Sequence, residues 1–295
     1  NLGIGGSANL TLGGTVNGAG SLTKNGTAGL TLSGSNNFMG GTTLNAGTLT
    51  LGTGASLGSG ALTVAGASTL DNTAPLVLAN NLNVNANLAL AGNNNLTLGG
   101  VIAGAGTLTK NGLAVLTLSG NNTFNGILNI LSGSLSTVGN NALGNPAELN
   151  LGSGATLNLG GNTRLGELSG DGGVKVATGT GLQVGGGTFD GVLSGTGTLD
   201  KVGADTLTLN GSNTLTGATT VSGGSLVVDG SLASSTVTVN NGTTLGGNGT
   251  LGGTVTVANG GHLAVTSGST LNVGSLVLGS GSMLDAGLGA PVVGT

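Results

Sequence analysis

The sequence predicts an all-β fold, a parallel β-helix (β-solenoid) of roughly 15 turns, on three observations. Aliphatic residues alternate with Thr in short runs such as 30–32 and 237–239, and a period of two places them on one face of a strand. The runs recur, because Leu30 and Leu49 lie 19 residues apart. The same spacing separates Leu116 from Leu135 and Leu207 from Leu226. Gly accounts for 66 of 295 residues and supplies the backbone conformations that tight corners need.

Small, uncharged residues dominate the composition, and this excludes several classes of protein. Charged residues make up 5% of the chain, against about 25% in ordinary soluble domains. The basic residues are scattered, so we expect no nucleic-acid partner. No run approaches the ~18 apolar residues of a membrane-spanning helix. With no Cys in the chain, disulfides and thiolate metal sites are excluded.

One pattern occurs three times, at residues 18–34, 104–120 and 195–211. Because the composition does not shift along the chain, we expect residues 1–295 to form a single continuous β-helix. The long repeats are placed at about 13–98, 99–189 and 190–278.

Each long repeat carries one lysine at the same position, and two of the repeats carry a phenylalanine. We expect Lys24, Lys110 and Lys201 to be surface charges that discourage wrong lateral pairing of strands. Phe38 and Phe124 share one repeat position, and we expect them in the interior or folded over a corner.

The repeated pattern resembles a known family. The motif GTLTKNGxxxLTLSGxNxFxGxTxxxxGxL, visible at 20–49 and 106–135 and with Leu215 in the Phe position at 197–226, is similar to the passenger-associated strand repeat of bacterial autotransporters. Residues 231–295 resemble the last passenger turns before a membrane-embedded translocator barrel. The resemblance implies a right-handed parallel β-helix passenger, exported through the outer membrane of a Gram-negative cell to its surface or the extracellular space. Contact with a membrane is expected only through such a barrel, which we expect to lie outside this chain.

The function that follows is a non-enzymatic adhesin or a self-associating rod. Its expected partner is a host or matrix surface molecule or another copy of the chain, contacted through Thr- and Asn-rich faces. A passive structural stalk, or a filament formed by end-to-end stacking, is the main alternative. A polysaccharide-active β-helix and an ice-binding solenoid with aligned threonines are further alternatives.

Charged residues gather at two places, which we name as candidate ligand contacts. Asp200, Lys201 and Asp205 form the densest charged group, although a solvated corner is the simpler interpretation. The second group is Arg164, Glu167 and Asp171, whose exposed ion pairs would contribute only ~0–1 kcal/mol.

The sequence predicts no catalytic residue, no metal site and no cofactor. A catalytic triad needs a base within hydrogen-bond reach of a nucleophile, and the chain has one histidine, His262. Asp285, the nearest acid, is expected about one turn away, so we interpret His262 as a surface or corner residue. Residues 170–173 give only a single imperfect fragment of the repeats that bind calcium in β-rolls.

Overall fold

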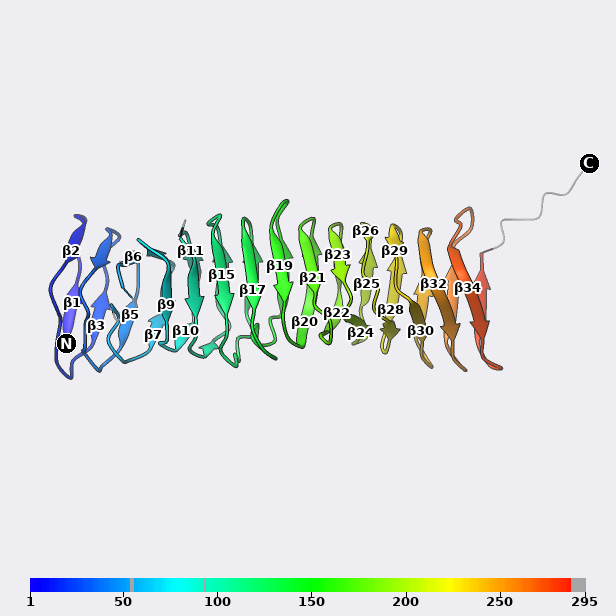
Figure 1. Ribbon diagram of the computed structural model, residues 1–295, viewed down its shortest axis with the longest axis horizontal. Coiled ribbons are helices and arrows are strands. Elements are labelled where there is room, and N and C mark those ends of the chain that lie inside the picture. The colour runs from blue at the N-terminus through cyan, green and yellow to red at the C-terminus, as the bar shows by residue number, and fades with distance from the viewer. Residues whose placement is uncertain (54–55, 93, 288–295) are drawn as a thin grey trace, which may run out of the picture. The chain divides into compact units, whose positions relative to one another are not determined.

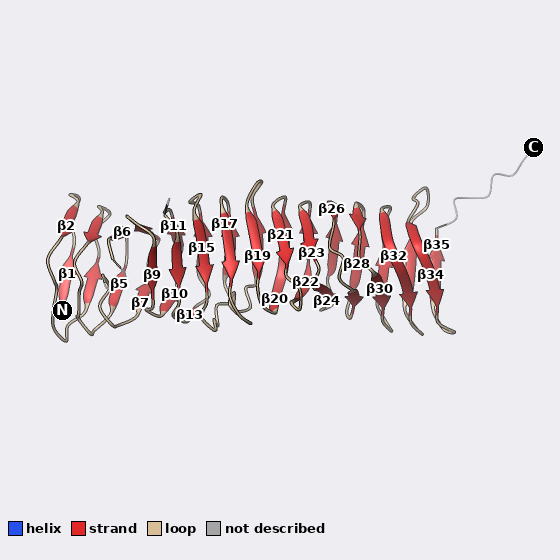
Figure 2. Cartoon of the chain, viewed as in Figure 1, coloured by secondary structure: helices blue, strands red, loops and turns tan. Residues whose placement is uncertain are grey.

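The computed structural model describes residues 1–53, 56–92 and 94–287, and all of its regular elements in that part of the chain are β-strands (Figure 2). The predicted parallel β-solenoid is confirmed, with about 14 turns where roughly 15 were predicted. The chain divides into two compact units, Asn1–Arg164 and Leu165–Thr295, which we call unit 1 and unit 2. Strand β20 (Thr163–Gly170) crosses from the first into the second.

Unit 1 consists of parallel strands stacked turn upon turn in three sheets (Figure 1). The first sheet contains β1 (Leu2–Ile4), β3 (Leu22–Lys24), β5 (Thr42–Leu44), β7 (Leu62–Val64), β10 (Leu82–Val84) and β13 (Ile102–Ala103). The second contains β2 (Leu10–Leu12), β4 (Leu30–Leu32), β6 (Gly47–Leu51), β8 (Ser68–Asn72), β11 (Leu88–Leu90), β14 (Thr107–Lys110), β16 (Ile127–Ile130) and β18 (Glu148–Leu151). The third contains β9 (Leu76–Leu78), β12 (Leu96–Leu98), β15 (Val115–Leu118), β17 (Ser134–Thr137) and β19 (Thr156–Leu159).

Unit 2 continues the same parallel pairing in three columns of strands. One runs through β22 (Gly181–Phe189), β24 (Thr198–Lys201), β27 (Thr219–Val221), β30 (Thr236–Val239), β32 (Thr250–Val257) and β34 (Asn272–Leu278). The second runs from β22 through β25 (Thr206–Leu209), β28 (Ser225–Val228), β31 (Thr244–Gly246), β33 (His262–Val265) and β35 (Met283–Ala286). The third holds β21 (Gly173–Val176) paired with β23 (Val192–Gly195), and β26 (Ser212–Asn213) paired with β29 (Ser231–Leu232), which pairs with β32.

The predicted leucine pairs are direct neighbours in adjacent turns. Leu30 lies opposite Leu49, and the same holds for Leu116 with Leu135 and for Leu207 with Leu226. The turn is not constant, however, because Gln183 lies opposite Asp200 and Ser136 lies opposite Asn158. These partners are 17 and 22 residues apart, and the commonest spacing is 20 residues, as between Leu88 and Leu108, so a fixed period of 19 overestimates the number of turns.

The interior of each unit is built from the aliphatic positions of the alternating runs. Leu30 and Leu32 are fully buried while Thr31 between them is half-buried on the outer face. Phe38 and Phe124 are 3% and 2% exposed, which confirms that they are interior residues. Leu215 is fully buried at the equivalent position of the third repeat.

The three repeats share a glycine corner just before or at the start of their last strand. Gly47, Gly133 and Gly224 have φ values of 74°, 66° and 58°, in the left-handed region that L-residues avoid. A Cβ at Gly133 would lie 2.4 Å from the carbonyl oxygen of Leu113 in the preceding turn. Glycine is therefore required there both for its φ angle and for the close stacking of turns.

Candidate functional site

The first predicted charged group is divided between the two faces of one strand. Asp200 is half-buried on the outer face of β24, where Gln183 Nε2 donates to Oδ2 at 3.2 Å and Ser222 Oγ donates to Oδ1 at 2.6 Å. Lys201 is fully buried on the inner face, and Asp205 is exposed at the following corner. Only the two carboxylates are therefore available to a ligand outside the coil.

The second predicted group consists of exposed side chains in both units. Arg164 is the last residue of unit 1, and Glu167 and Asp171 belong to unit 2. No cluster of three or more His, Cys, Asp or Glu that could hold a metal ion occurs in the described part of the chain.

His262 lies one turn from Asp285, as predicted. His262 Nδ1 is 3.5 Å from Asp285 Oδ2, between the adjacent strands β33 and β35. The two side chains are 30% and 65% exposed, and an exposed pair of this kind contributes ~0–1 kcal/mol.

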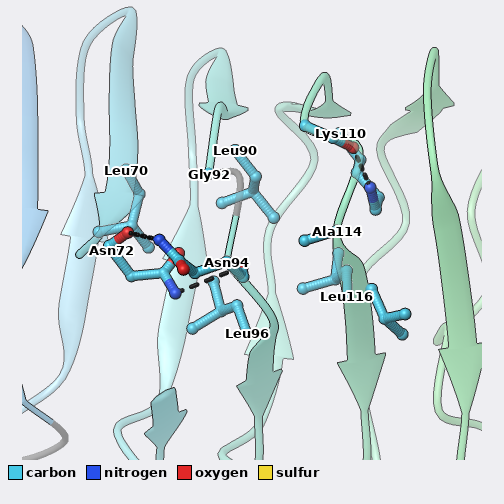
Figure 3. A pocket seen from close by; sticks show the side chains of 11 residues that line it. Leu70, Asn72, Leu90, Gly92, Asn94, Leu96, Lys110, Ala114 and Leu116 are labelled. Atoms are coloured by element: carbon cyan, nitrogen blue, oxygen red, sulfur yellow. Dashed lines mark hydrogen bonds between the residues drawn. The ribbon is translucent and has the colours of Figure 1, made fainter. Parts of the chain in front are cut away.

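A small cavity opens between turns of unit 1, beside β8, β11 and β15 (Figure 3). Its volume is about 20 Å³, room for about one water molecule. Leucines line it together with Asn72, Asn94 and Lys110. Asn72 Nδ2 donates to the carbonyl of Ala74 at 2.7 Å, and Asn94 Nδ2 donates to the carbonyl of Asn72 at 3.0 Å. The cavity is far below the ~300 Å³ of small-molecule pockets.

The three repeat lysines are inside the coil, so their prediction as surface charges is wrong. Lys24, Lys110 and Lys201 are 2%, 2% and 0% exposed. Each ammonium is held by backbone carbonyls of its own turn and of the next turn. Lys24 Nζ donates to the carbonyl of Gly26 at 2.6 Å and to that of Ala46 at 3.0 Å.

The other two lysines repeat this arrangement. Lys110 Nζ donates to the carbonyl of Gly112 and, at 2.9 Å, to that of Ser132. Lys201 Nζ donates to the carbonyls of Val202 at 2.8 Å, Gly203 at 3.2 Å and Gly223 at 2.9 Å. In all three copies the acceptor in the next turn directly precedes the left-handed glycine, whose φ helps to orient that peptide.

Burial lowers the pKa of all three lysines, because the charged ammonium loses its hydration inside the coil. At Lys201 the carboxylates of Asp205 and Asp200 oppose this effect and raise the pKa. The carbonyl contacts stabilise the remaining charge, because a buried cation needs partners to replace water.

An asparagine lies twelve residues after each lysine and is also buried. Asn36, Asn122 and Asn213 are 5%, 1% and 1% exposed. Their Oδ1 atoms accept hydrogen bonds from backbone amides 20 residues earlier, at 2.7, 2.7 and 2.8 Å. Nδ2 of Asn36 and Nδ2 of Asn122 donate to carbonyls 20 residues later, and Nδ2 of Asn213 donates to the carbonyl of Gly211. These side chains therefore join consecutive turns from inside.

The segments that contain these lysines and asparagines match a known sequence family. Residues 22–51, 108–136 and 199–228 match the family described as passenger-associated-transport-repeat. The chain carries passenger-associated transport repeats. Each repeat has strands in two consecutive turns and contains one buried lysine and one buried asparagine. Neither a curated protein nor a solved structure matches the chain.

Repeats of this kind in a β-solenoid are consistent with an autotransporter passenger domain. They imply a passenger exported to the cell surface. The match identifies no catalytic family. No helix in residues 1–53, 56–92 and 94–287 is long and apolar enough to cross a membrane.

Sequence reasoning missed the interior role of the lysines, although a signal was present. In Leu22-Thr23-Lys24 the lysine lies two residues after a buried leucine, and alternation places such residues on the same face. The buried asparagines gave a weaker signal, because they lie outside the alternating Leu-Thr-Leu runs.

Proposed function

We propose that this chain is a non-enzymatic passenger segment that acts by surface contact, with another copy of itself as its partner. The observation that supports this proposal is a set of uncharged polar rows on the outer faces of the sheets. Thr23, Thr43 and Thr63 lie opposite one another in three successive turns, and Asn83 continues the row. In unit 2, Thr220, Thr238 and Thr256 form a second such row.

Hydrogen bonds between turns join side chains of these rows and of neighbouring rows. Asn45 Nδ2 donates to Asn25 Oδ1 at 2.6 Å, and Asn83 Nδ2 donates to Thr63 Oγ1 at 3.4 Å. Ser134 Oγ and Thr156 Oγ1 are 2.6 Å apart. Side chains held in this way lose little further entropy when they bind, which favours contact.

A second copy suits these rows because it has the same repeat distance. Parallel strands lie ~4.8 Å apart, so two such rows can match at every turn. Each contact is weak and uncharged, and many contacts along a face add by avidity. A host or matrix surface molecule is the other candidate partner, while a passive stalk would need no such contact.

Charge placed on one row tests this proposal. We expect the full chain to sediment as dimers or larger species, and to increase the settling of cells that display it. Thr43→Lys with Thr63→Lys should shift the protein to monomers, because like charges would face each other across the contact. Ser267→Lys with Thr270→Lys, at exposed loop positions, adds the same charge and should leave association unchanged.

Two outcomes would contradict self-association, and a third would contradict the role of the threonine row in it. A chain that is monomeric at all concentrations, with no effect on settling, would favour the passive stalk. Binding of the monomer to an immobilised matrix surface would favour a host or matrix molecule. Equal loss of association in both lysine variants would mean that net charge, rather than the threonine row, controls it.

A further inference from the structure

The aliphatic interior by itself does little to define which residues pair between turns. Leu88, Leu108, Leu128 and Leu149 lie opposite one another in successive turns. Leu96, Leu116, Leu135 and Leu157 form a similar row in the third sheet. A slip of two residues keeps the same face inward, so one aliphatic side chain of each short strand would still meet an aliphatic side chain of the next turn. Hydrophobic burial is non-directional and discriminates poorly between such registers.

The three lysines interrupt neighbouring inner rows. Lys110 lies directly between Leu90 of the preceding turn and Ile130 of the next. Figure 3 shows its side chain with a hydrogen bond, beside the leucines of the cavity. Lys24 lies between Ile4 and Leu44 in the same way, and Lys201 lies between Val184 and Val221. Each lysine thus occupies a position that is aliphatic in both neighbouring turns.

The contacts of these lysines with carbonyls of the next turn exist only in the native register. Lys110 reaches Ser132, 22 residues later, because that carbonyl lies at the corner of the next turn. A two-residue slip of one strand would move the ammonium by about 6.6 Å along the strand direction relative to that carbonyl. The charge would then be buried without this partner, which is far more costly than a misplaced methyl group.

The asparagines also favour the native register, through their contacts with the preceding turn. Asn122 Oδ1 accepts from the amide of Ile102 at 2.7 Å, and Asn36 and Asn213 have equivalent donors. A slipped strand would bury an amide group without its partners, and that also costs free energy. The lysine therefore favours the native register with the following turn, and the asparagine favours it with the preceding turn.

The geometry points to a specific role for each passenger-associated transport repeat: its buried lysine and asparagine are register markers that define which residues pair between consecutive turns. They discriminate among registers that the repetitive aliphatic interior would otherwise allow. This role does not depend on self-association. It concerns the inner face of the coil, whereas the proposed function concerns the outer face.

The test replaces the markers with apolar side chains and asks whether one register survives. We compare the full-length wild type with a triple variant, Lys24→Met, Lys110→Met and Lys201→Met, after refolding from denaturant. Hydrogen exchange read by mass spectrometry reports how many populations each peptide contains. Lys175→Met is the matched control, because Lys175 is exposed on β21. We expect single populations for the wild type and the control.

For the triple variant we expect at least two populations in the repeat peptides, with the ratio of native to slipped molecules reduced about tenfold or more. The denaturant midpoint of its native population should not fall, because methionine removes a buried charge. A lowered midpoint with one native population would show a merely stabilising role and overturn the inference. One native population at the wild-type yield and midpoint would overturn it as well.

A single variant keeps the test decisive if the triple variant does not fold. Lys110→Met should produce mixed populations in peptides within about 105–136 and leave peptides around Lys201 uniform. Mixed populations spread evenly over the whole chain would contradict a local marker, and so would a uniform native pattern everywhere.

Discussion

One methyl group added at Gly133 should force two neighbouring turns of unit 1 apart. Gly133 has a φ of 66°, and an L-residue in that region costs about 1–2 kcal/mol. The added Cβ would lie 2.4 Å from the carbonyl oxygen of Leu113, whereas Cβ atoms are essentially never found closer than 3.0 Å to such an atom. The shift would weaken the bond from the amide of Thr156 to the carbonyl of Gly133, now 2.9 Å, worth about 0.5–1.5 kcal/mol. Gly133→Ala should therefore cost about 1.5–3.5 kcal/mol.

Two other glycines of unit 1 separate the steric cost from the backbone cost. Gly139 has a φ of 83° and nothing within 4 Å of its added Cβ, so Gly139→Ala should cost only about 1–2 kcal/mol. Gly14 has an equally open site without a positive φ, so Gly14→Ala should be neutral or slightly stabilising.

Urea unfolding followed by far-ultraviolet circular dichroism measures the losses, and hydrogen exchange assigns them to peptides near each substitution. The reasoning fails if Gly133→Ala and Gly139→Ala have equal unfolding free energies, because close stacking would then contribute nothing.

Two further predictions concern interior residues. Phe124→Leu should cost less than about 1.5 kcal/mol, because the third repeat has Leu215 buried at that position, whereas Phe124→Ala should cost about 3–5 kcal/mol in urea unfolding. Equal losses for the two Phe124 variants would contradict this. Burial lowers the pKa of Lys24 and Lys110 below 10.5 in the folded state. At pH values between the pKa of the folded state and 10.5, the unfolded state therefore binds more protons than the folded state, and the unfolding free energy should rise with pH across this range. Lys24→Met with Lys110→Met should reduce this rise in urea midpoints between neutral and alkaline pH to the part that Lys201 contributes, whereas Lys175→Met should retain it in full.

The strands could be predicted because their signal is local. In Leu116-Thr117-Leu118 the alternation of two residue types is itself the pattern of burial, and the 19-residue spacing to Leu135 is a direct neighbour distance. The number of turns was less accurate, because turns such as the one from Ser136 to Asn158 hold extra residues in their corners. Corners are sites where a coil accepts insertions without disturbing its interior.

The lysines were mispredicted because their partners are distant in sequence. A charged side chain is normally exposed, and nothing near Lys24 indicates that the carbonyl of Ala46 will satisfy it. That contact exists only once two turns have stacked. A prediction from local pattern therefore gives the face of the residue, but not the reason that the charge is tolerated there.

The carbonyl contacts of the repeat lysines depend on two consecutive turns and not on which sheet of the coil holds the lysine. Lys24 lies in β3 of the first sheet of unit 1, whereas Lys110 lies in β14 of the second. Their separation of 86 positions is not a whole number of 20-residue turns, so the second repeat begins on a different sheet. The carbonyl contacts are nevertheless the same in both copies. In a parallel coil, the corner after a strand lies beside the equivalent corner of the next turn, whichever sheet the strand belongs to. A register marker can therefore operate in any sheet. A binding surface that required one particular sheet could not be repeated in this way.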